Sequence, residues 1–562
     1  MPSRQSSTAG YFNLGNYQRS VSTHSPDAQT WFNRGLTWAY AFNHQESASC
    51  FEQAILSDPN CAMAYWGLAF ALGPNYNKPW DLFDGQELLM ITRLAHRATM
   101  EAKRHEDSAS PVERALIDAL MQRYPQEKPY DDCTTWNSQY ASAMTSVYER
   151  FPEDLDVVAL YVDSLMNLTP WQLWDLSTGQ PPPGACTMEA KRALDRILAQ
   201  QRALQHPGLL HLYIHLTEMS PTPELGLPIA DHLRGLVPDA GHLEHMPSHI
   251  DVLCGDYRRA IASNTSAIRA DVKFLSTRKN GHFYNLYKCH DYHFRMYAAM
   301  LAGQSKIAID TANSLAESVT EDILRIESPP MEDWLEGFVG ARVHALIRFG
   351  KWDSILALAL PTDASLYCVT TAMIHYGKGV AYAATGRVDE AEQEESLFDK
   401  AHQRVPSSRT IFNNTCVDIL KVAALMLRGE IAYRRKDYDD AFNHLRNAVE
   451  LDDNLPYDEP WGWMQPTRHA LGALLLEQNR VEEALDVYAA DLGLDESLPR
   501  ALTHPNNIWS LHGYHECLMR MQRLAEARII KPQLQLAMAV ADVLVKSSCF
   551  CRLKTEMPSH LE

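Results

Sequence analysis

Pairs of small residues recur at a fixed spacing along the C-terminal part of this chain, and they restrict how it can fold. A glycine is followed by an alanine twelve residues later in four pairs, which are Gly379 and Ala391, Gly429 and Ala441, Gly472 and Ala484, and Gly513 and Ala525. Small residues at such points let two antiparallel helices approach closely, while large apolar residues fill the space between neighbouring pairs of helices. The spacing therefore predicts a series of stacked helical hairpins.

The N-terminal part repeats this pattern in the register of a tetratricopeptide (TPR) repeat. Such a repeat has about 34 residues, with a small residue near position 8, alanine near positions 20 and 27, and often proline near position 32. Positions 4, 8, 20, 24, 27 and 32 are occupied here by Trp31, Gly35, Ser47, Phe51, Ala54 and Pro59. The alternation of polar and apolar residues that indicates β-strands is almost absent. We predict an all-α fold, a TPR-like α-solenoid formed by a superhelical array of helical hairpins.

Charge and hydropathy argue against two classes of partner. The formal net charge is −19, from 51 Lys and Arg against 70 Asp and Glu, which disfavours nucleic acid and anionic membrane surfaces. No segment approaches the roughly 20 apolar residues that span a bilayer, and the polar N-terminus lacks the apolar core of a secretory signal. The eleven cysteines are scattered, with only Cys549 and Cys551 close together, so we expect mostly buried or free thiols. We predict a cytoplasmic protein.

The repeat pattern divides the chain into six predicted segments. These are a flexible N-terminal segment (1–24), N-terminal TPR-like repeats (25–166), a Pro- and Trp-rich loop (167–188), central His-rich repeats (189–320), C-terminal TPR repeats (321–548) and a tail (549–562). A second loop rich in proline and aromatic residues spans 452–466. Long loops on a solenoid often carry function, but packing over the next hairpin is an equally good explanation of both loops.

Three short segments in the centre of the chain contain eight histidines at helical spacings. The segments are HPGLLHLYIHLTE, GHLEHMPSHI and CHDYH, which begin at His206, Gly241 and Cys289. In TPR arrays, positions 2, 5, 9 and 12 of a repeat share one helix face and point into the concave groove. With Ala260 at position 20, these groove positions are occupied in two consecutive repeats by His211, His215 and Glu218 and by His242, His245 and His249. In the next repeat, which contains an insertion, a register set by Gly303 and Ala308 places His290 and His293 at positions 2 and 5.

Neutral imidazoles in such a group suit zinc, iron or copper. We predict a divalent transition metal as cofactor, with His211, His215, His245 and His249 as ligands. Glu218, His242 and Glu459 are the predicted catalytic residues, and the further candidates are His206, His290, His293 and Asp458. Pro247 interrupts one helix, because a proline inside a helix removes a backbone hydrogen bond. A helix beginning near Met246 would leave His242 and His245 in the preceding loop.

The same segments resemble a widespread family of TPR-like proteins from bacteria and fungi, most of which are known only by their repeats. The resemblance rests on the motifs HPG…HxxIHxxE, GHLxHMPxHI and YDEP, which stand here at His206–Glu218, Gly241–Ile250 and Tyr457–Pro460, with Pro466 and Arg468 following. It covers most of the chain and is weakest around His290 and His293. Fungal members occur in gene clusters for small-molecule biosynthesis, so the resemblance implies a role in secondary metabolism.

Two functions follow from these patterns. The first is a metal-dependent enzyme that acts on a small molecule, with hydrolase, lyase or cyclase, and oxidase chemistry all open. The chain has no Gly-rich dinucleotide turn, P-loop or nucleophile elbow, so we predict no nucleotide or flavin cofactor. The alternative is a TPR scaffold that binds a peptide or protein partner, in which the histidines, or a metal they hold, are structural. The expected groove positions carry few Lys or Arg residues to clamp a peptide carboxylate.

Overall fold

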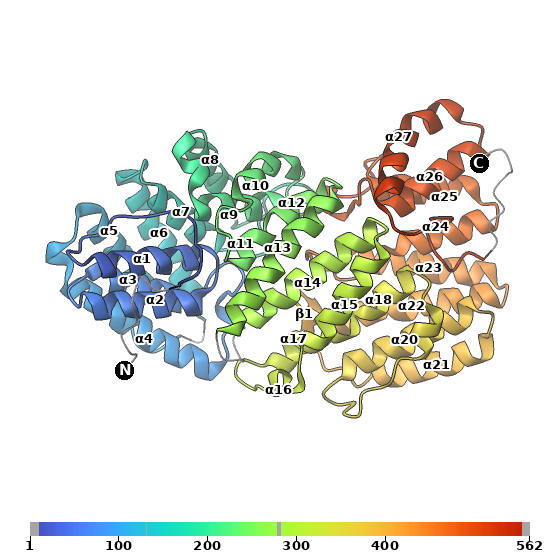
Figure 1. Ribbon diagram of the computed structural model, residues 1–562, viewed down its shortest axis with the longest axis horizontal. Helices are drawn as coiled ribbons and strands as arrows, with labels where there is room; N and C mark the ends of the chain where they lie inside the picture. Colours follow the sequence, from blue (N-terminus) through green and yellow to red (C-terminus); the bar gives the residue numbers. More distant parts are fainter. Residues whose placement is uncertain (1–9, 131, 278–282, 554–562) are drawn as a thin grey trace. The chain divides into compact units, whose positions relative to one another are not determined.

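The computed structural model describes residues 10–130, 132–277 and 283–553, and it is helical almost throughout (Figure 1). Apart from one two-stranded antiparallel sheet, the regular elements of these residues are helices. The predicted all-α, TPR-like fold is confirmed. The chain forms two compact units, the first from residues 1–250 and 266–279 and the second from residues 251–265 and 280–562. The predicted segment boundaries at 166, 188 and 320 do not coincide with this division.

The first unit is a series of helical hairpins. Its helices are α1 (Pro26–Tyr40), α2 (His44–Ser57), α3 (Ala62–Leu72), α4 (Gly85–Arg104), α5 (Pro111–Arg123), α6 (Thr134–Arg150), α7 (Leu155–Met166), α8 (Thr187–Leu198), α9 (Pro207–Glu218), α10 (Leu227–Leu233), α11 (Gly241–His245) and the start of α12 (Pro247–Leu253). Short 3-10 turns are η1 (Trp80–Leu82), η2 (Glu106–Ser108), η3 (Gln201–Gln205) and η4 (Pro223–Gly226). The end of α13 (Tyr257–Ser276) also belongs to this unit.

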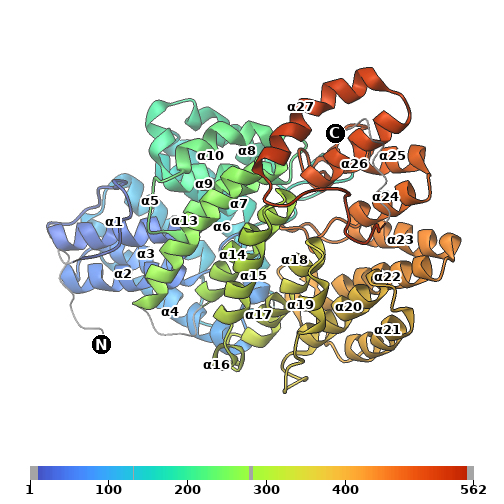
Figure 2. The same ribbon diagram turned by 45° about the vertical axis from the view of Figure 1, so that its right-hand side comes forward.

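The second unit continues the same architecture. Its helices after α13 are α14 (Tyr284–Leu301), α15 (Ser305–Ser318), α16 (Glu321–Leu324), α17 (Met331–Gly340), α18 (Arg342–Arg348), α19 (Trp352–Leu356), α20 (Cys368–Ala384), α21 (Val388–His402), α22 (Cys416–Arg434), α23 (Tyr438–Asp453), α24 (Thr467–Glu477), α25 (Val481–Leu492), η5 (Arg500–Leu502), α26 (Ile508–Arg520) and α27 (Leu524–Val540). The strands β1 (Thr410–Ile411) and β2 (Asn414–Thr415) pair in antiparallel register. Helices α20 to α23 lie side by side in both views (Figures 1 and 2).

The small residues of the repeat pattern lie where helices meet. A Cβ atom on Gly472 would stand 2.5 Å from the ring of Tyr488, and one on Gly513 would stand 2.2 Å from the same ring. Tyr488 is fully buried between α24 and α26. The glycines therefore make room for a large side chain, as the sequence pattern predicts.

One backbone conformation recurs in the turns of the hairpins. The residue two positions before the second helix has a positive φ in eight of the described turns, at Phe42, Gly255, Gly303, Gly350, Gly386, Lys436, Asn479 and Gln522. Glycine adopts this left-handed conformation without strain, whereas a bulky residue does not. Phe42 (φ 53°) is therefore the exceptional member of the series.

Curvature of the first unit brings its first hairpin against its fifth, so that α1 contacts α9. The N-terminal segment, which the sequence predicted to be flexible, is fixed from residue 10 onward in the described structure. Arg19 pairs with Asp154 and Asp156 at the start of α7, at 2.8 and 2.7 Å, and Asn13 N donates to Asp239 at 2.6 Å. These ion pairs and hydrogen bonds explain why the segment is ordered.

The two predicted loops lie between helices. Residues 167–188 connect α7 to α8, and the Nε1–H of Trp174 donates to the carbonyl of Leu216 in α9. Residues 452–466 connect α23 to α24, with Trp461 and Trp463 buried. Cys549 and Cys551 are joined by a disulfide, and the other nine cysteines form no disulfide in the described structure. Within the described ranges, no helix is both long and apolar enough to cross a membrane.

Candidate metal centre

Five of the predicted site histidines gather in the first unit. His211 and His215 lie one turn apart on α9, His242 and His245 lie on α11, and His249 lies on α12. None of the five residues is more than 1% exposed. This corrects the expectation that they line an open concave groove. The first hairpin and the loop 167–188 contribute side chains that cover them, because α1 packs against α9.

The hydrogen bonds of His211 determine which of its nitrogens is free to bind an ion. Its Nδ1 lies 2.7 Å from the carbonyl oxygen of Tyr40. A carbonyl can only accept, so Nδ1 carries the hydrogen and Nε2 of the neutral ring presents a lone pair. Metal-binding histidines are usually oriented by an oxygen acceptor in this way.

Glu218 lies beside two further imidazoles and is hydrogen-bonded to one of them. Its Oε1 lies 2.9 Å from Nδ1 of His215, and its Oε2 lies 3.0 Å from Nδ1 of His249. The carboxylate accepts from Nδ1 of His215, which leaves the Nε2 lone pair of His215 for another partner, while Nδ1 of His249 lies at ion-pair distance from the carboxylate. His215 Nε2 is buried and has no hydrogen-bond partner among the described residues. The structure therefore places Glu218 behind the imidazoles rather than among the ion-facing atoms of this group.

The ion-facing nitrogens are close enough to share one ion. Nε2 of His211 lies 3.1 Å from Nε2 of His242, and one nitrogen each of His211, His215 and His242 lies within 4.8 Å of the others. Two ligands of a tetrahedral zinc ion are separated by roughly 3.3 Å when both bonds are about 2.0 Å. Beside this set, Nε2 of His245 lies 2.7 Å from Nε2 of His249. His242, for which the sequence predicted a catalytic role, therefore lies among the candidate metal ligands.

Aromatic rings surround this histidine cluster, which we define as His211, His215, His242, His245 and His249. The ring of Phe42 lies 4.4 Å from that of His211, 5.8 Å from His215 and 5.6 Å from His242, between centroids. Tyr76 lies 4.9 Å and Trp171 6.0 Å from His215. These rings exclude water from the imidazoles. No sequence pattern points directly to Phe42, although its place in a turn that favours glycine is a usable signal.

Burial keeps the imidazoles neutral. It lowers the pKa values of His211 and His215 well below the ordinary value, and the neighbouring imidazoles lower them further. Burial raises the pKa of Glu218, while His249 opposes that rise. Neutral imidazoles are the form that binds a transition metal. The electrostatics of His211 and His215 therefore fit metal ligands and do not fit imidazolium cations.

Comparisons with known proteins add little about function. No known family matches the chain, and no curated protein does. Similar solved structures include the APC/C hetero-tetramer Cut9-Hcn1 (13% identity, 84% of this chain and 74% of that chain, TM-score 0.30), Naa15/Naa10 bound to HypK-THB (13%, 91% and 70%, 0.21), and yeast Tom70 (12%, 91% and 92%, 0.24). At these TM-scores we draw no conclusion from the similarities.

His206 and the helix around Pro247 differ from the sequence expectation. His206 caps α9, since its Nδ1 accepts from Leu209 N, and its Nε2 lies 3.2 Å from Asp156. His242 and His245 lie in α11, as the repeat register predicts, and not in the loop that a helix start near Met246 would leave; α12 begins at Pro247. Met246 retains helical geometry between them (φ −49°, ψ −39°), so the proline costs little at the first position of a new helix.

The remaining predicted residues belong to the second unit. Asp458 is buried and accepts from Nδ2 of Asn414 at 3.2 Å, and Tyr457 donates to Glu459. Burial raises the pKa of Asp458 well above its ordinary value. His290 packs against Phe412, and His293 lines a small cavity together with His344.

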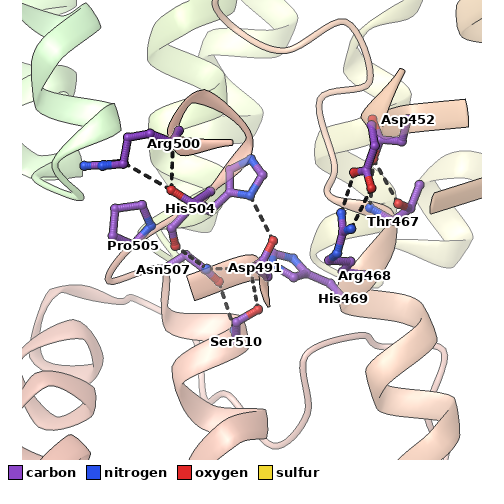
Figure 3. A network of polar contacts seen from close by, with 12 residues as sticks. Asp452, Thr467, Arg468, His469, Asp491, Arg500, His504, Pro505, Asn507 and Ser510 are labelled. Carbon is purple, nitrogen blue, oxygen red and sulfur yellow. Dashed lines mark hydrogen bonds and ion pairs between the residues drawn. The ribbon is translucent and has the colours of Figure 1, made fainter. Parts of the chain in front are cut away.

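No sequence pattern indicated the polar network that surrounds Asp491 in the second unit (Figure 3). Asp491, 1% exposed, accepts from Nε2 of His469 (3.1 Å), Nδ1 of His504 (2.9 Å), Nδ2 of Asn507 (2.9 Å) and Oγ of Ser510 (2.5 Å). Arg348 donates to Nδ1 of His469 at 2.8 Å. An arginine can only donate, so the hydrogen of His469 lies on Nε2. Burial lowers the pKa of His469 to about 4. We interpret this network as structural.

Proposed function

We propose that this protein binds a divalent transition metal through His211, His215 and His242 and uses it in a reaction of a small molecule. The observation that carries the proposal is the direction of the lone pairs. His211 and His215 each have Nδ1 engaged by an oxygen acceptor, Nε2 of His211 lies 3.1 Å from Nε2 of His242, and one nitrogen each of the three rings lies within 4.8 Å of the others. Imidazoles of this kind suit zinc, iron or copper.

The composition of the site supports catalysis. Three histidines are the ligand set of catalytic zinc sites, which keep a fourth position for water or substrate. A bound ion would act as a Lewis acid and lower the pKa of bound water. His245, His249 and Glu218 form an adjoining chain that can hold a proton, with contacts of 2.7 and 3.0 Å. Secondary metabolism, implied by the family resemblance, is the setting we propose.

Elemental analysis of protein purified without a histidine tag tests metal binding. We expect about one transition-metal ion per chain, lost in His215→Ala and in His211→Ala. The matched control is His375→Ala, because His375 forms a half-buried pair with Glu394 (2.7 Å) and belongs to none of the histidine groups found in the described residues. Metal-free wild-type protein that also fails to take up Zn²⁺, Co²⁺ or Cu²⁺ at micromolar concentration contradicts the proposal.

Catalysis is tested separately with metal-loaded protein. Wild type, His215→Ala and His375→Ala are incubated with a small-molecule extract, and consumption of each compound is followed by mass spectrometry. We expect a compound consumed by wild type and His375→Ala only. Stoichiometric metal with no difference between the three profiles would assign the ion a structural role, in keeping with the complete burial of the histidine cluster.

A second candidate function is a scaffold for a peptide or protein partner. It is supported by a groove between α5 and α6 of about 650 Å³, lined mainly by small and polar side chains such as Ala119, Gln122, Ser142 and Ser146. Partner binding at this groove should be weakened by Ala119→Arg and unaffected by His215→Ala. The opposite result favours the histidine cluster as the functional site.

A further inference from the structure

Two buried histidines of the second unit have ring nitrogens without hydrogen-bond partners. His293 on α14 is 1% exposed, and neither its Nδ1 nor its Nε2 has a partner within the described residues. His344 on α18 is 4% exposed, and its Nδ1 is likewise unpartnered there. Buried polar atoms of proteins nearly always find a partner. The two imidazoles therefore indicate an occupant that the protein's own atoms do not supply.

A small cavity brings the two imidazoles together. His293 and His344 both line a space of about 20 Å³, which is large enough for one water molecule or one ion. Burial lowers the pKa of each imidazole to about 3, and the neighbouring His344 contributes to the shift of His293. Both rings are therefore neutral, and each has a lone pair available for an ion.

Sulfur-containing side chains line the same cavity. They are Met373 on α20, Met464 before α24 and Cys416 at the start of α22, and none of them is more than 3% exposed. A Cβ atom on Gly337, which also lines the cavity, would stand 3.2 Å from Sγ of Cys416. The other described residues of the lining are glycine or aliphatic. The cavity thus combines imidazole and sulfur, which suit Cu(I), and lacks the side-chain oxygens that Mg²⁺ and Ca²⁺ prefer.

The surroundings of the cavity favour an ion of low charge. No described residue of the lining is a carboxylate, a lysine or an arginine. Moving an ion out of water is costly, and the cost rises with the charge of the ion when no opposite charge lies beside it. Neutral imidazoles and thioethers cannot offset a second positive charge. A monovalent ion is therefore easier to accommodate here than Zn²⁺.

Packed helices hold the imidazoles in place. Helices α14, α17 and α18 contact one another, and α20 packs against α17, α18 and α22. The ring of Phe338 lies 5.1 Å from that of His293, and the ring of Trp463 lies 4.5 Å from that of His344, both edge to face. These aromatic neighbours restrict the orientation of both imidazoles before any ion binds.

We propose that His293, His344, Met373 and Met464 form a binding site for one Cu(I) ion in the second unit. The imidazoles supply nitrogen ligands and the thioethers supply soft sulfur ligands. The site shares no residue with the histidine cluster, and it does not rest on the function proposed for that cluster.

Titration with Cu(I) in competition with the chromophoric chelator bicinchoninate tests the site. The full-length His215→Ala variant is titrated without oxygen and with ascorbate, so that the histidine cluster is already impaired. We expect one Cu(I) ion per chain that excess Zn²⁺ does not displace, and X-ray absorption at the copper edge should show sulfur as well as nitrogen ligands. A chain that takes up no Cu(I), whose cavity then holds water only, overturns the proposal. Copper without a sulfur ligand overturns it as well.

Further variants in the same background separate binding from folding. His293→Leu should abolish Cu(I) uptake and leave the Tm of the metal-free protein equal or higher, because it removes two unpartnered nitrogens. Met464→Leu nearly conserves volume, and it should weaken Cu(I) binding by about ten-fold or more, since even an outer-shell partner of a metal is worth that much. The matched control is Met331→Leu, because Met331 is fully buried in α17 and is not among the lining residues. Full Cu(I) uptake by His293→Leu would show that the copper binds elsewhere.

Discussion

At the scale of single residues, Phe42 combines a strained backbone with a central place in the candidate site. Seven other hairpin turns have a positive φ at the same position, four of them with glycine. The Phe42 ring contacts His211, His215 and His242. We infer that the strain, about 1–2 kcal/mol for a left-handed residue, is tolerated because the ring fills the space beside the imidazoles.

Phe42→Gly should therefore lower stability although it relieves the backbone. Losing a buried phenylalanine costs about 3–5 kcal/mol, which exceeds the gain, so we expect a net loss of roughly 2–3 kcal/mol in urea unfolding. Metal affinity should fall as water reaches the imidazoles. Lys436→Gly is the control, because Lys436 holds the same turn position (φ 68°) and should become equally stable or more stable. A Phe42→Gly variant as stable as wild type would show that the ring contributes little.

At the scale of elements, Asp491 connects α25 with α24 and with the segment leading into α26 (Figure 3). All four side-chain partners donate to its carboxylate, and an asparagine would turn an amide donor toward one of them. We expect Asp491→Asn to lower the free energy of unfolding by about 3 kcal/mol. Asp310→Asn, in an exposed pair with Lys306, should cost less than about 0.5 kcal/mol.

The difference in free energy of unfolding between wild type and Asp491→Asn should depend on pH in one direction only. Burial by itself would raise the pKa of Asp491, but His469 and His504 hold it well below its ordinary value. A carboxylate with a depressed pKa stabilises the fold above its unfolded pKa of about 3.9 and loses that contribution as the pH falls further. The difference between wild type and Asp491→Asn should therefore be constant from pH 7.5 to 5. A difference that disappears by pH 5.5 would contradict a depressed pKa.

At the scale of the whole molecule, the division into two units predicts where a metal stabilises the chain. The histidine cluster lies entirely in the first unit. Saturating metal at a hundred times Kd should add about 2.7 kcal/mol to that unit. In hydrogen exchange we expect slower exchange of amides in α1, α9 and α11 and unchanged exchange in α20 to α27. Equal protection of both units would show that the metal acts on the chain as one cooperative body.

Periodicity alone determined the fold class, because paired glycines and alanines can satisfy close helix packing only in stacked hairpins. Local spacing also identified His211, His215, His242, His245 and His249, since residues three and four apart share a helix face. Both inferences depend on neighbours in sequence. They needed no knowledge of how distant segments meet.

Tertiary structure decided what surrounds those residues. The curvature that brings α1 against α9 places the Tyr40 carbonyl on His211 and the Phe42 ring among the imidazoles, so positions expected in an open groove are buried. Asp491 likewise acquires its surroundings from other helices. Such contacts join residues far apart in the chain, and they depend on the small rotation between successive hairpins, which no local pattern specifies.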